Sequence, residues 1–332
     1  MNGSPFDALL AVTYRCNARC VMCNIWQTPP EEALSPAEWT NIPVSLKHIN
    51  ISGGEPFLRD DVPEIVQGVR ERCPGAKLII STNGISTTRI VQSMKKIVGI
   101  DPRIGVGISI DGIEEVHDRI RGLKGTYEKA LNTLRALQEM GIRDLRVAFT
   151  AVEENVDQMK SVYDLSRDLG VEFSCVVAHD SDIYFKTSGI RLSSITCLKE
   201  QLNLVALSEL RTFVPKRLLR SYFYSGLYGL VENGERILPC LAGRASFFID
   251  PTGELYPCNV LNSSIGNIRS EPFARLWGSQ RAAQVREEVA NCRRPCWMMC
   301  SARSSIKKNP GRVGLWILKN KTGIHLGRRS VI

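Results

Sequence analysis

Six short apolar runs, separated by helix-like stretches, constrain the fold of this chain more than any other feature. The runs lie at 8–13, 47–52, 77–81, 104–110, 145–151 and 171–177, and helical stretches cover 61–72, 87–98, 126–140 and 155–169. Strands that alternate with helices predict a parallel sheet with right-handed crossovers. Six units are too few to close an eight-stranded barrel, so we expect an α/β fold built on an open, partial (β/α)6 TIM-like barrel. Its functional residues should lie at the carboxyl ends of the strands.

Three cysteines follow the first apolar run on one short loop. Cys16, Cys20 and Cys23 have the spacing C-x3-C-x2-C. Three thiolates can bind three irons of a [4Fe–4S] cube and leave the fourth iron without a protein ligand. An open coordination position indicates a reaction centre, as it does at catalytic metal sites. The alternatives are a zinc site, which normally takes four protein ligands, and buried cysteines that are close by chance.

A second motif indicates which kind of iron–sulfur site the cysteine loop forms. Gly53, Gly54, Glu55 and Pro56 follow the run at 47–52. Together with the cysteine loop they resemble the motifs of the radical SAM enzymes. The resemblance implies that the three cysteines hold a cluster, that S-adenosylmethionine chelates its free iron, and that reductive cleavage gives a 5'-deoxyadenosyl radical. In that family the GGEP motif meets the methionine amino group: glycine allows close approach, Glu55 supplies an anionic acceptor and Pro56 stiffens the turn.

Polar residues at the ends of three later strands resemble the same family. The segments are 78–84, with the family's TNG motif, 104–112 and 145–155. The resemblance implies cofactor contacts from Met22, Thr82, Asn83, Ser109, Asp111, Arg121, Thr150 and Asn155. Arg121 could instead pair with another carboxylate or phosphate through its planar guanidinium, or lie on the surface. Without the resemblance, each segment would be a strand followed by a turn whose polar residues make local hydrogen bonds.

The C-terminal third carries a second set of cysteines around a predicted hairpin at 247–258. The set is Cys240, Cys258, Cys292, Cys296 and Cys300. It resembles the SPASM/twitch extension of radical SAM enzymes, although part of the full SPASM cysteine pattern is missing. Five thiols suffice for one auxiliary [4Fe–4S] cluster and not for two fully ligated ones, so we expect one. Either four thiols close the cube, or three do and leave an iron open to substrate; structural zinc is the alternative.

The other cysteines lie outside both sets. A free cysteine is usually a small buried hydrophobe, which we expect for Cys73 and Cys197. Cys175 lies in the sixth predicted strand, whose end faces the barrel mouth. Because epimerases of the family use a thiol to return hydrogen to the substrate radical, Cys175 is a candidate hydrogen donor as well as a candidate core residue. His179, Asp180 and Tyr184, on the following loop, are candidate substrate contacts, although a polar loop needs no ligand to explain it.

The 332 residues are enough for a barrel-sized domain and a smaller one. We expect a barrel at 1–190, a helical connector at 191–235, a small cysteine-rich α+β domain at 236–302 and a basic tail at 303–332. No apolar run approaches the ~18 residues of a membrane span, and the first residues do not have the pattern of a signal peptide. Eleven cysteines in such a chain indicate a reducing compartment and metal binding. We therefore expect a cytoplasmic protein, peripheral to the membrane if the tail binds lipid.

Positive charge is concentrated in the tail. Residues 301–332 contain eight Lys or Arg and no Asp or Glu, which accounts for nearly all of the formal charge of +9. Within them, the segment 313–321 places Trp316 and aliphatic residues beside lysines. Such a segment can lie on an anionic membrane, bind a phosphorylated substrate, or dock its apolar face on the barrel. Nucleic-acid binding is not expected, because no aromatic stacking platform or binding module is recognised.

These features together predict a radical SAM oxidoreductase or a related C–H functionalising enzyme. We expect net oxidation of a small molecule, such as a sugar, nucleoside or lipid-linked saccharide, with the auxiliary cluster accepting an electron or binding the substrate. A flavodoxin or ferredoxin would supply electrons. The first strand begins near residue 8, without a preceding leader-peptide-binding domain, which favours a small molecule over a peptide. The alternatives are a peptide epimerase or cross-linking maturase, a non-catalytic iron–sulfur electron carrier, and an enzyme with zinc in both cysteine sets.

Overall fold

A computed structural model describes residues 4–332 of the chain. Its strands are β1 (Asp7–Ala11), β2 (His48–Ser52), β3 (Lys77–Thr82), β4 (Gly105–Ser109), β5 (Asp144–Ala151), β6 (Glu172–Val177), β7 (Ser246–Ile249), β8 (Glu254–Tyr256) and β9 (Gly266–Asn267). They form one nine-stranded sheet in the order β6-β5-β4-β3-β2-β1-β7-β8-β9. β1 to β6 pair in parallel in chain order, as the alternation of strands and helices predicts.

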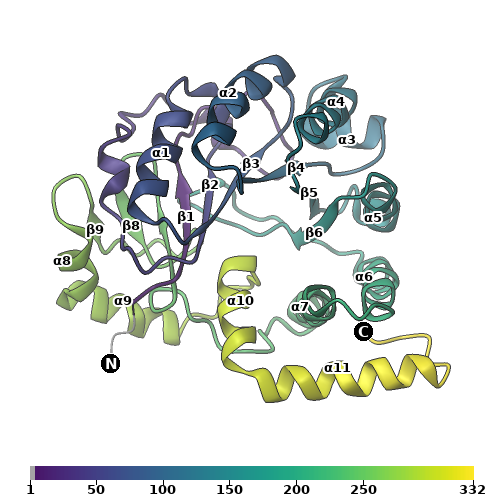
Figure 1. The fold of residues 1–332 in the computed structure, drawn as a ribbon. Helices are drawn as coiled ribbons and strands as arrows, with labels where there is room; N and C mark the ends of the chain where they lie inside the picture. Colours follow the sequence, from purple (N-terminus) through teal and green to yellow (C-terminus); the bar gives the residue numbers. More distant parts are fainter. Residues whose placement is uncertain (1–3) are drawn as a thin grey trace.

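Helices cover the outer face of the curved sheet and close its open side. The helices are α1 (Val62–Arg72), α2 (Thr87–Ile100), α3 (Glu115–Arg121), α4 (Thr126–Glu139), α5 (Met159–Asp168), α6 (Ile195–Leu210), α7 (Pro215–Asn233), α8 (Phe273–Gly278), α9 (Gln280–Ala290), α10 (Met299–Lys308) and α11 (Pro310–His325). Single 3-10 turns lie at Ile25–Gln27, Glu38–Thr40, Pro56–Leu58 and Val156–Gln158. Figure 1 shows α1, α2, α4 and α5 along the outer face and α7 and α10 on the opposite side. The partial (β/α)6 barrel is confirmed.

The burial of the strands shows that the barrel interior is not fully packed. In β5, every second residue, including Leu145, Val147 and Phe149, is buried under the outer helices. The residues between them, Arg146 and Ala148 among others, border a cavity inside the barrel. A parallel sheet buried on both faces normally has near-continuous apolar strands. The alternation in β2, β3, β5 and β6 therefore indicates one face against helices and one face toward a hollow interior.

The C-terminal hairpin extends the barrel sheet. β7 and β8 form the antiparallel hairpin expected at 247–258. β7 also pairs in parallel with β1, with Asp7 opposite Ser246 and Leu10 opposite Ile249. This pairing was not predicted, because the two partners lie in distant parts of the chain. Since one sheet runs through both regions, the division at 1–190, 191–235, 236–302 and 303–332 remains a proposal.

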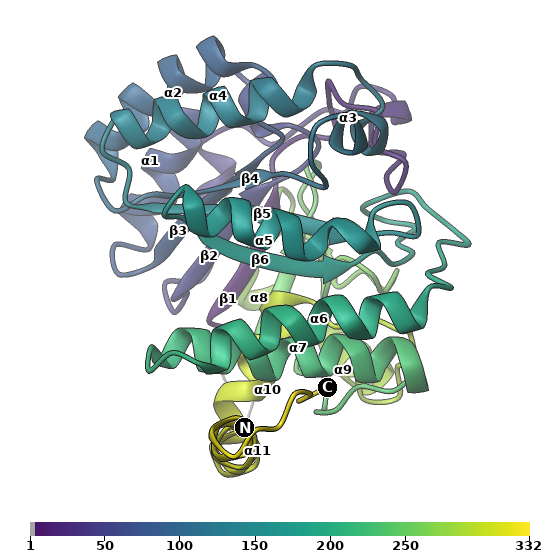
Figure 2. The ribbon, with the colours of Figure 1, turned by 90° about the vertical axis from the view of Figure 1, so that its right-hand side faces the viewer.

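The basic tail folds into α10 and α11, and α11 docks on the helical connector. Figure 2 shows α11 beneath α6 and α7. The Lys321 ammonium donates hydrogen bonds to the carbonyl oxygens of Leu210 and Thr212, at 2.8 and 2.7 Å. Trp316 packs edge-on against Tyr222 with a ring separation of 5.4 Å. Among residues 4–332, we find no helix with the length and apolar character that a membrane span requires.

Candidate active site

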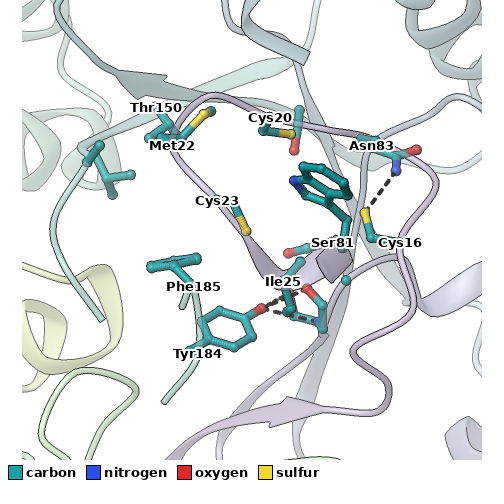
Figure 3. Close-up of a pocket in the computed structure, with 18 of the residues that line it drawn as sticks. Cys16, Cys20, Met22, Cys23, Ile25, Ser81, Asn83, Thr150, Tyr184 and Phe185 are labelled. Atoms are coloured by element: carbon teal, nitrogen blue, oxygen red, sulfur yellow. Dashed lines mark hydrogen bonds between the residues drawn. The ribbon is translucent and has the colours of Figure 1, made fainter. Parts of the chain in front are cut away.

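The carboxyl ends of the strands enclose a cavity of about 180 Å³, which we call the cysteine-loop cavity (Figure 3). The three cysteines of the first loop border it, together with most of the cofactor contacts predicted from the sequence. These wall residues are Cys16, Cys20, Met22, Cys23, Gly53, Gly54, Thr82, Asn83, Ser109, Arg121 and Thr150. The predicted contacts therefore converge on one site, although they come from five separate strand ends.

The three thiols are arranged around the cavity rather than at a point. Among residues 4–332, no three His, Cys, Asp or Glu side chains are close enough to chelate a single ion. Burial raises the pKa of Cys16 to about 11 and that of Cys23 to about 12, so metal binding must displace their protons. The Arg121 guanidinium donates to Cys20 Sγ at 3.6 Å and provides a positive charge beside the thiolates. This donor set fits a cluster that occupies the space between the sulfurs.

The two glycines after β2 hold the cysteine loop in place. A Cβ atom on Gly53 would lie 2.2 Å from the carbonyl oxygen of Thr13, and one on Gly54 would lie 2.3 Å from that of Arg15. The Gly54 amide donates to Thr13 O at 2.7 Å, so the two loops pack backbone to backbone. Gly53 has φ +141°, which also favours glycine. Glycine is thus required here by the neighbouring loop as well as by the cavity.

Four predicted cofactor contacts lie behind the cavity wall and do not border it. They are Glu55, Pro56, Asp111 and Asn155. The Glu55 carboxylate accepts hydrogen bonds from the Thr82 hydroxyl at 2.9 Å, the Asn83 amide at 2.8 Å and the Phe57 amide at 3.2 Å. Burial raises the pKa of Glu55 to about 7. In this structure Glu55 therefore joins the GGEP loop to the end of β3.

Asp111 organises the ends of β4 and β5 in the same way. Its buried carboxylate forms an ion pair with Arg121 and accepts from the Thr150 amide at 2.7 Å. The Asn155 side chain donates to the Asp111 carbonyl at 2.8 Å. The Asp111 amide donates to His117 Nδ1 at 3.0 Å, and burial lowers the pKa of His117 to about 3, which keeps this acceptor neutral. Arg121 and Thr150 are the members of this network that border the cavity.

The loop after β6 closes the remaining side of the cysteine-loop cavity. The Tyr184 hydroxyl lies 2.9 Å from Ser52 Oγ and donates to the Gly53 carbonyl at 3.1 Å, which joins this loop to the GGEP loop (Figure 3). Of the three expected substrate contacts, His179 and Tyr184 border the cavity, whereas Asp180 does not and accepts from the amides of Gly189 and Ile190 at 2.8 and 2.9 Å. Sequence reasoning missed Trp26, Phe185 and Met298, which also border it and belong to no motif. The only signal in the sequence is their position next to motif or candidate residues: Trp26 follows the cysteine loop, Phe185 follows Tyr184, and Met298 lies between Cys296 and Cys300.

The second cysteine set lies around the β7–β8 hairpin and the segment before α10. Burial raises the pKa of Cys258 to about 11 and that of Cys296 to about 12. The Arg236 guanidinium donates to Cys296 Sγ at 3.5 Å and to the carbonyl oxygens of Arg294, at 2.9 Å, and Cys292. A positive charge beside several thiols suits a negatively charged thiolate cluster, as Arg121 suits the first set. Arg236 was not predicted from the sequence, because it lies before the first cysteine of the set, Cys240, and belongs to no motif.

Comparison with known proteins identifies the family. The family described as the radical SAM superfamily matches residues 10–165, and the iron–sulfur cluster-binding domain SPASM matches residues 240–301. Mycofactocin maturase MftC of Mycolicibacterium smegmatis is 30% identical over 294 residues, which cover 82% of this chain and 70% of the relative. The chain belongs to the radical SAM superfamily. It is therefore a radical SAM enzyme with [4Fe–4S] clusters and S-adenosylmethionine as cofactors, and its C-terminal cysteines form a SPASM-type domain.

Two further similarities concern the whole chain. Fe-coproporphyrin III synthase of Methanosarcina barkeri is 27% identical over 347 residues, covering 92% of this chain and 84% of the relative. The solved structure of native anSMEcpe with bound AdoMet aligns with a TM-score of 0.65 over 96% of this chain and 100% of that one. Its sequence is 15% identical, so this match establishes the radical SAM fold and not a shared substrate.

Cys175 does not lie at the barrel mouth, which corrects the expected position of a hydrogen donor. The pleat of β6 directs its neighbours Ser174 and Val176 toward the barrel interior, and Cys175 therefore points the other way. Its side chain is 1% exposed within the main core and borders neither cavity described here. Cys73 is buried as expected, and Cys197 is partly buried against the same core.

A second cavity, of about 540 Å³, occupies the barrel interior toward the amino ends of the strands. We call it the larger cavity. Ser81, Val176 and Met298 border both cavities, so the two are adjacent. Cys300, from the SPASM cysteine set, borders the larger one. The interior of this radical SAM barrel thus lies between the first cysteine loop and the second cysteine set.

Proposed function

We propose that this enzyme oxidises a small molecule, such as a sugar, nucleoside or lipid-linked saccharide, at an unactivated C–H bond. When bound, S-adenosylmethionine and its [4Fe–4S] cluster supply the 5'-deoxyadenosyl radical that takes a hydrogen atom from the substrate. The C-terminal cysteines would hold the iron–sulfur centre that accepts a second electron from the substrate radical, which would also release a proton. A flavodoxin or ferredoxin is the proposed external electron donor.

The position of the larger cavity is the observation that carries this proposal. A substrate there would reach the cysteine-loop cavity past Ser81 and Val176, and it would reach the second cysteine set at Cys300. A substrate in the larger cavity would therefore border both the cysteine-loop cavity and one cysteine of the second set. Small-molecule sites usually have volumes of ~300–1,000 Å³, and about 540 Å³ falls in this range.

Peptide modification is the second candidate function. It is favoured by the similarity to mycofactocin maturase MftC and to the sporulation killing factor maturation protein SkfB of Bacillus subtilis, 25% identical over 87% of this chain. The similarity to Fe-coproporphyrin III synthase favours a small molecule instead. The volume of the larger cavity, about 540 Å³, is the reason for placing the small molecule first.

Substrate-stimulated cofactor cleavage distinguishes the two candidates. The reconstituted, reduced holoenzyme is incubated anaerobically with S-adenosylmethionine and either a protein-free metabolite extract or the peptide fraction of the same cells. We expect the metabolite extract to stimulate 5'-deoxyadenosine formation and the peptide fraction to leave it at the basal rate. Stimulation by the peptide fraction alone would overturn the small-molecule proposal. A Cys258→Ala/Cys296→Ala variant should still cleave the cofactor but fail to complete the oxidation.

We also propose that α11 contacts an anionic membrane surface. Leu315 and Leu318 of α11 are 70% and 66% exposed, close in sequence to the exposed Lys319, and Leu326, which follows the helix, is 83% exposed. Exposed leucines flanked by lysines and arginines are typical of helices that lie in the membrane interface. Binding to phosphatidylserine liposomes should be firm at low salt and fade as salt rises, because each basic residue contributes ~1 kcal/mol near such a surface. A Leu315→Ser/Leu318→Ser variant should bind weakly, and a wild-type protein that ignores these liposomes would refute the proposal.

A further inference from the structure

The larger cavity is open because the barrel strands present small residues to it. Ser81, Gly107, Ala148 and Ser174 border it from four neighbouring strands. In closed barrels the corresponding inward positions are filled mainly by branched side chains. The pairing Ser81↔Gly107 and Ala148↔Ser174 places these small residues side by side across the sheet.

Gly107 has no local backbone reason to be glycine. It lies within β4 without a positive φ, and an added Cβ would lie 3.4 Å from Arg146 Cγ, 3.6 Å from Arg146 Cδ and 3.9 Å from Ser81 Oγ, which are ordinary contacts. Glycine within a strand normally weakens it, and one reason to find it there is the close approach of a ligand. This contrasts with Gly53, where the neighbouring backbone forbids a side chain. Gly107 therefore maintains space in the barrel interior.

The wall of the larger cavity is apolar on one side and basic on the other. Apolar side chains come from the strands, α7 and α10, and include Ile79, Phe223 and Met299. The basic side chains at its amino-end mouth are Arg146, Lys216, Arg220, Arg303 and Lys307, whereas Asp7 is the only acidic residue that borders it among those described.

Most of these cations already have carboxylate partners. Arg146 pairs with Asp144, Lys216 and Arg220 pair with Glu172, and Arg303 donates to Asp7 at 2.8 Å. Lys307 differs, because within residues 4–332 its ammonium forms no ion pair and lies 3.2 Å from His48 Nε2. Burial lowers the pKa of His48 to about 4, so this imidazole is neutral at pH 7 and does not compensate the ammonium charge. Asp7, the ion-pair partner of Arg303, is also close enough to Lys307 to interact with its charge, so one carboxylate faces two cations and the mouth carries a net positive charge.

We propose that the larger cavity binds an amphipathic organic anion, whose apolar body fills the barrel interior and whose carboxylate or phosphate pairs with Lys307 beside Arg303. This assignment of a substrate class rests on the proposed function. It places the anionic group at the amino end of the barrel, away from the cysteine-loop cavity. The rest of the molecule then extends past Ser81 and Val176 toward the reacting position. A neutral molecule of the same size would lack the interaction at the mouth.

A fluorescent anion tests this site on the reconstituted holoenzyme. The probe is 8-anilinonaphthalene-1-sulfonate, and the comparison ligand is N-phenyl-1-naphthylamine, which has the same ring systems without the charge. We expect Lys307→Gln to weaken binding of the sulfonate about tenfold, which corresponds to ~1.4 kcal/mol, and to leave binding of the neutral amine unchanged. Lys308→Gln is the matched control, since Lys308 is an exposed neighbour on α10 that does not border the cavity.

A second variant tests the space itself. Gly107→Leu should abolish binding of both naphthyl compounds, whereas Gly99→Leu should not, because a Cβ on Gly99 in α2 would meet nothing within 4 Å. Iron content and melting temperature establish that each variant is folded. Sulfonate binding that is unchanged in both Lys307→Gln and Gly107→Leu would overturn the proposal.

Competition against the bound sulfonate identifies the anionic group. Displacement by coproporphyrin III alone assigns a carboxylate, and displacement by UDP-glucose alone assigns a phosphate. Displacement by neither would contradict the site. Basal 5'-deoxyadenosine formation by the wild-type enzyme, measured in parallel, keeps the two proposals separate. Normal cofactor cleavage with no anion site would refute only this inference, and absent cleavage would refute the proposed function.

Discussion

The two ends of the barrel interior are built on opposite principles. At the carboxyl end, Glu55 and Asp111 are buried behind the cysteine-loop cavity, where Glu55 accepts from the Asn83 amide and Asp111 pairs with Arg121. At the amino end, the larger cavity is bordered by small residues, and Lys307 stands at its mouth without a carboxylate partner. One end is a rigid frame around a cofactor whose chemistry is common to the superfamily. The other end leaves volume and charge available for a molecule specific to this enzyme.

This difference implies that side chains at the two ends respond differently to substitution. Removing a member of the bonded frame leaves a buried partner unsatisfied, which costs much more than the interaction itself contributes. Removing a residue that maintains space or an unpaired charge costs little stability and changes ligand binding instead. Matched substitutions at the two ends of the barrel interior test this difference.

The largest effect on stability is expected at the Asp111–Arg121 ion pair. Arg121→Met leaves the fully buried Asp111 carboxylate without its cation. Breaking a buried pair in this way costs ~3–5 kcal/mol. Urea unfolding of the iron-free protein should report this loss, and an Asp111→Leu/Arg121→Met double variant should recover part of it. If the unfolding free energy of Arg121→Met lies within about 0.5 kcal/mol of the wild-type value, the Asp111 carboxylate does not depend on Arg121 for its burial.

Gly53→Ala should be the next most damaging change. The added Cβ would lie 2.2 Å from the Thr13 carbonyl oxygen, at a φ of +141° that alanine rarely adopts. Strain at such a position costs ~1–3 kcal/mol, and displaced backbone adds to it. Because Thr13 leads into the cysteine loop, we expect lower melting temperature together with lower iron content in the first set. Retention of the first cluster at wild-type occupancy would argue against the packing of the two loops.

Glu55→Gln should have a smaller effect that depends on pH. The side-chain NH2 group of the glutamine would face the backbone N–H of Asn83 or Phe57, both of which now donate to the Glu55 carboxylate. Two donors that face each other leave a buried group without an acceptor, which costs ~1–3 kcal/mol. Burial raises the pKa of Glu55 to about 7 from an ordinary 4.5, so the folded protein holds this proton more tightly than the unfolded chain. The contribution to stability is thus fully present below pH 4.5 and lost as pH rises through 7. The difference in unfolding free energy between wild type and Glu55→Gln should fall over this range; a constant difference would contradict the raised pKa.

Much of the carboxyl-end frame could be predicted from the sequence, because its residues follow strands in a fixed order. Strand ends in a parallel barrel meet at one edge, so motifs such as 53–56 and 82–84 had to lie together. What the motifs could not show is which polar groups face the cavity and which support it. Glu55 and Asn155 lie behind the wall because strand pleat and local turns direct them there.

The amino end was not predicted, since it has no motif. Its space results from residues such as Gly107 and Ala148, which are individually common in strands, and from the β1–β7 pairing that places α10 across the barrel. These depend on contacts between distant parts of the chain. The prediction for Cys175 was wrong for a simpler reason. Alternate side chains of β6 point to opposite faces of the sheet, and Cys175 points into the core while its neighbours Ser174 and Val176 face the barrel interior.

The smallest effect on stability is expected for Gly107→Ala. Alanine fits the available space and restricts the unfolded chain, so stability should rise by ~0.4–1 kcal/mol, in contrast to Gly53→Ala. Thermal unfolding of the two variants side by side measures the contrast directly. A marked destabilisation by Gly107→Ala would show that the larger cavity is less open than the structure indicates, and would weaken the distinction between the two ends.

The most direct test of the account is the cofactor cleavage that depends on the first cysteine loop. Wild-type protein, reconstituted anaerobically, should hold about eight irons and form 5'-deoxyadenosine from S-adenosylmethionine when reduced. A Cys16→Ala/Cys20→Ala/Cys23→Ala variant should form none and keep about half of the iron in the second set. Cys197→Ala, outside both sets, serves as the control and should behave as wild type. Production of 5'-deoxyadenosine by the triple variant at the wild-type rate would contradict the central claim.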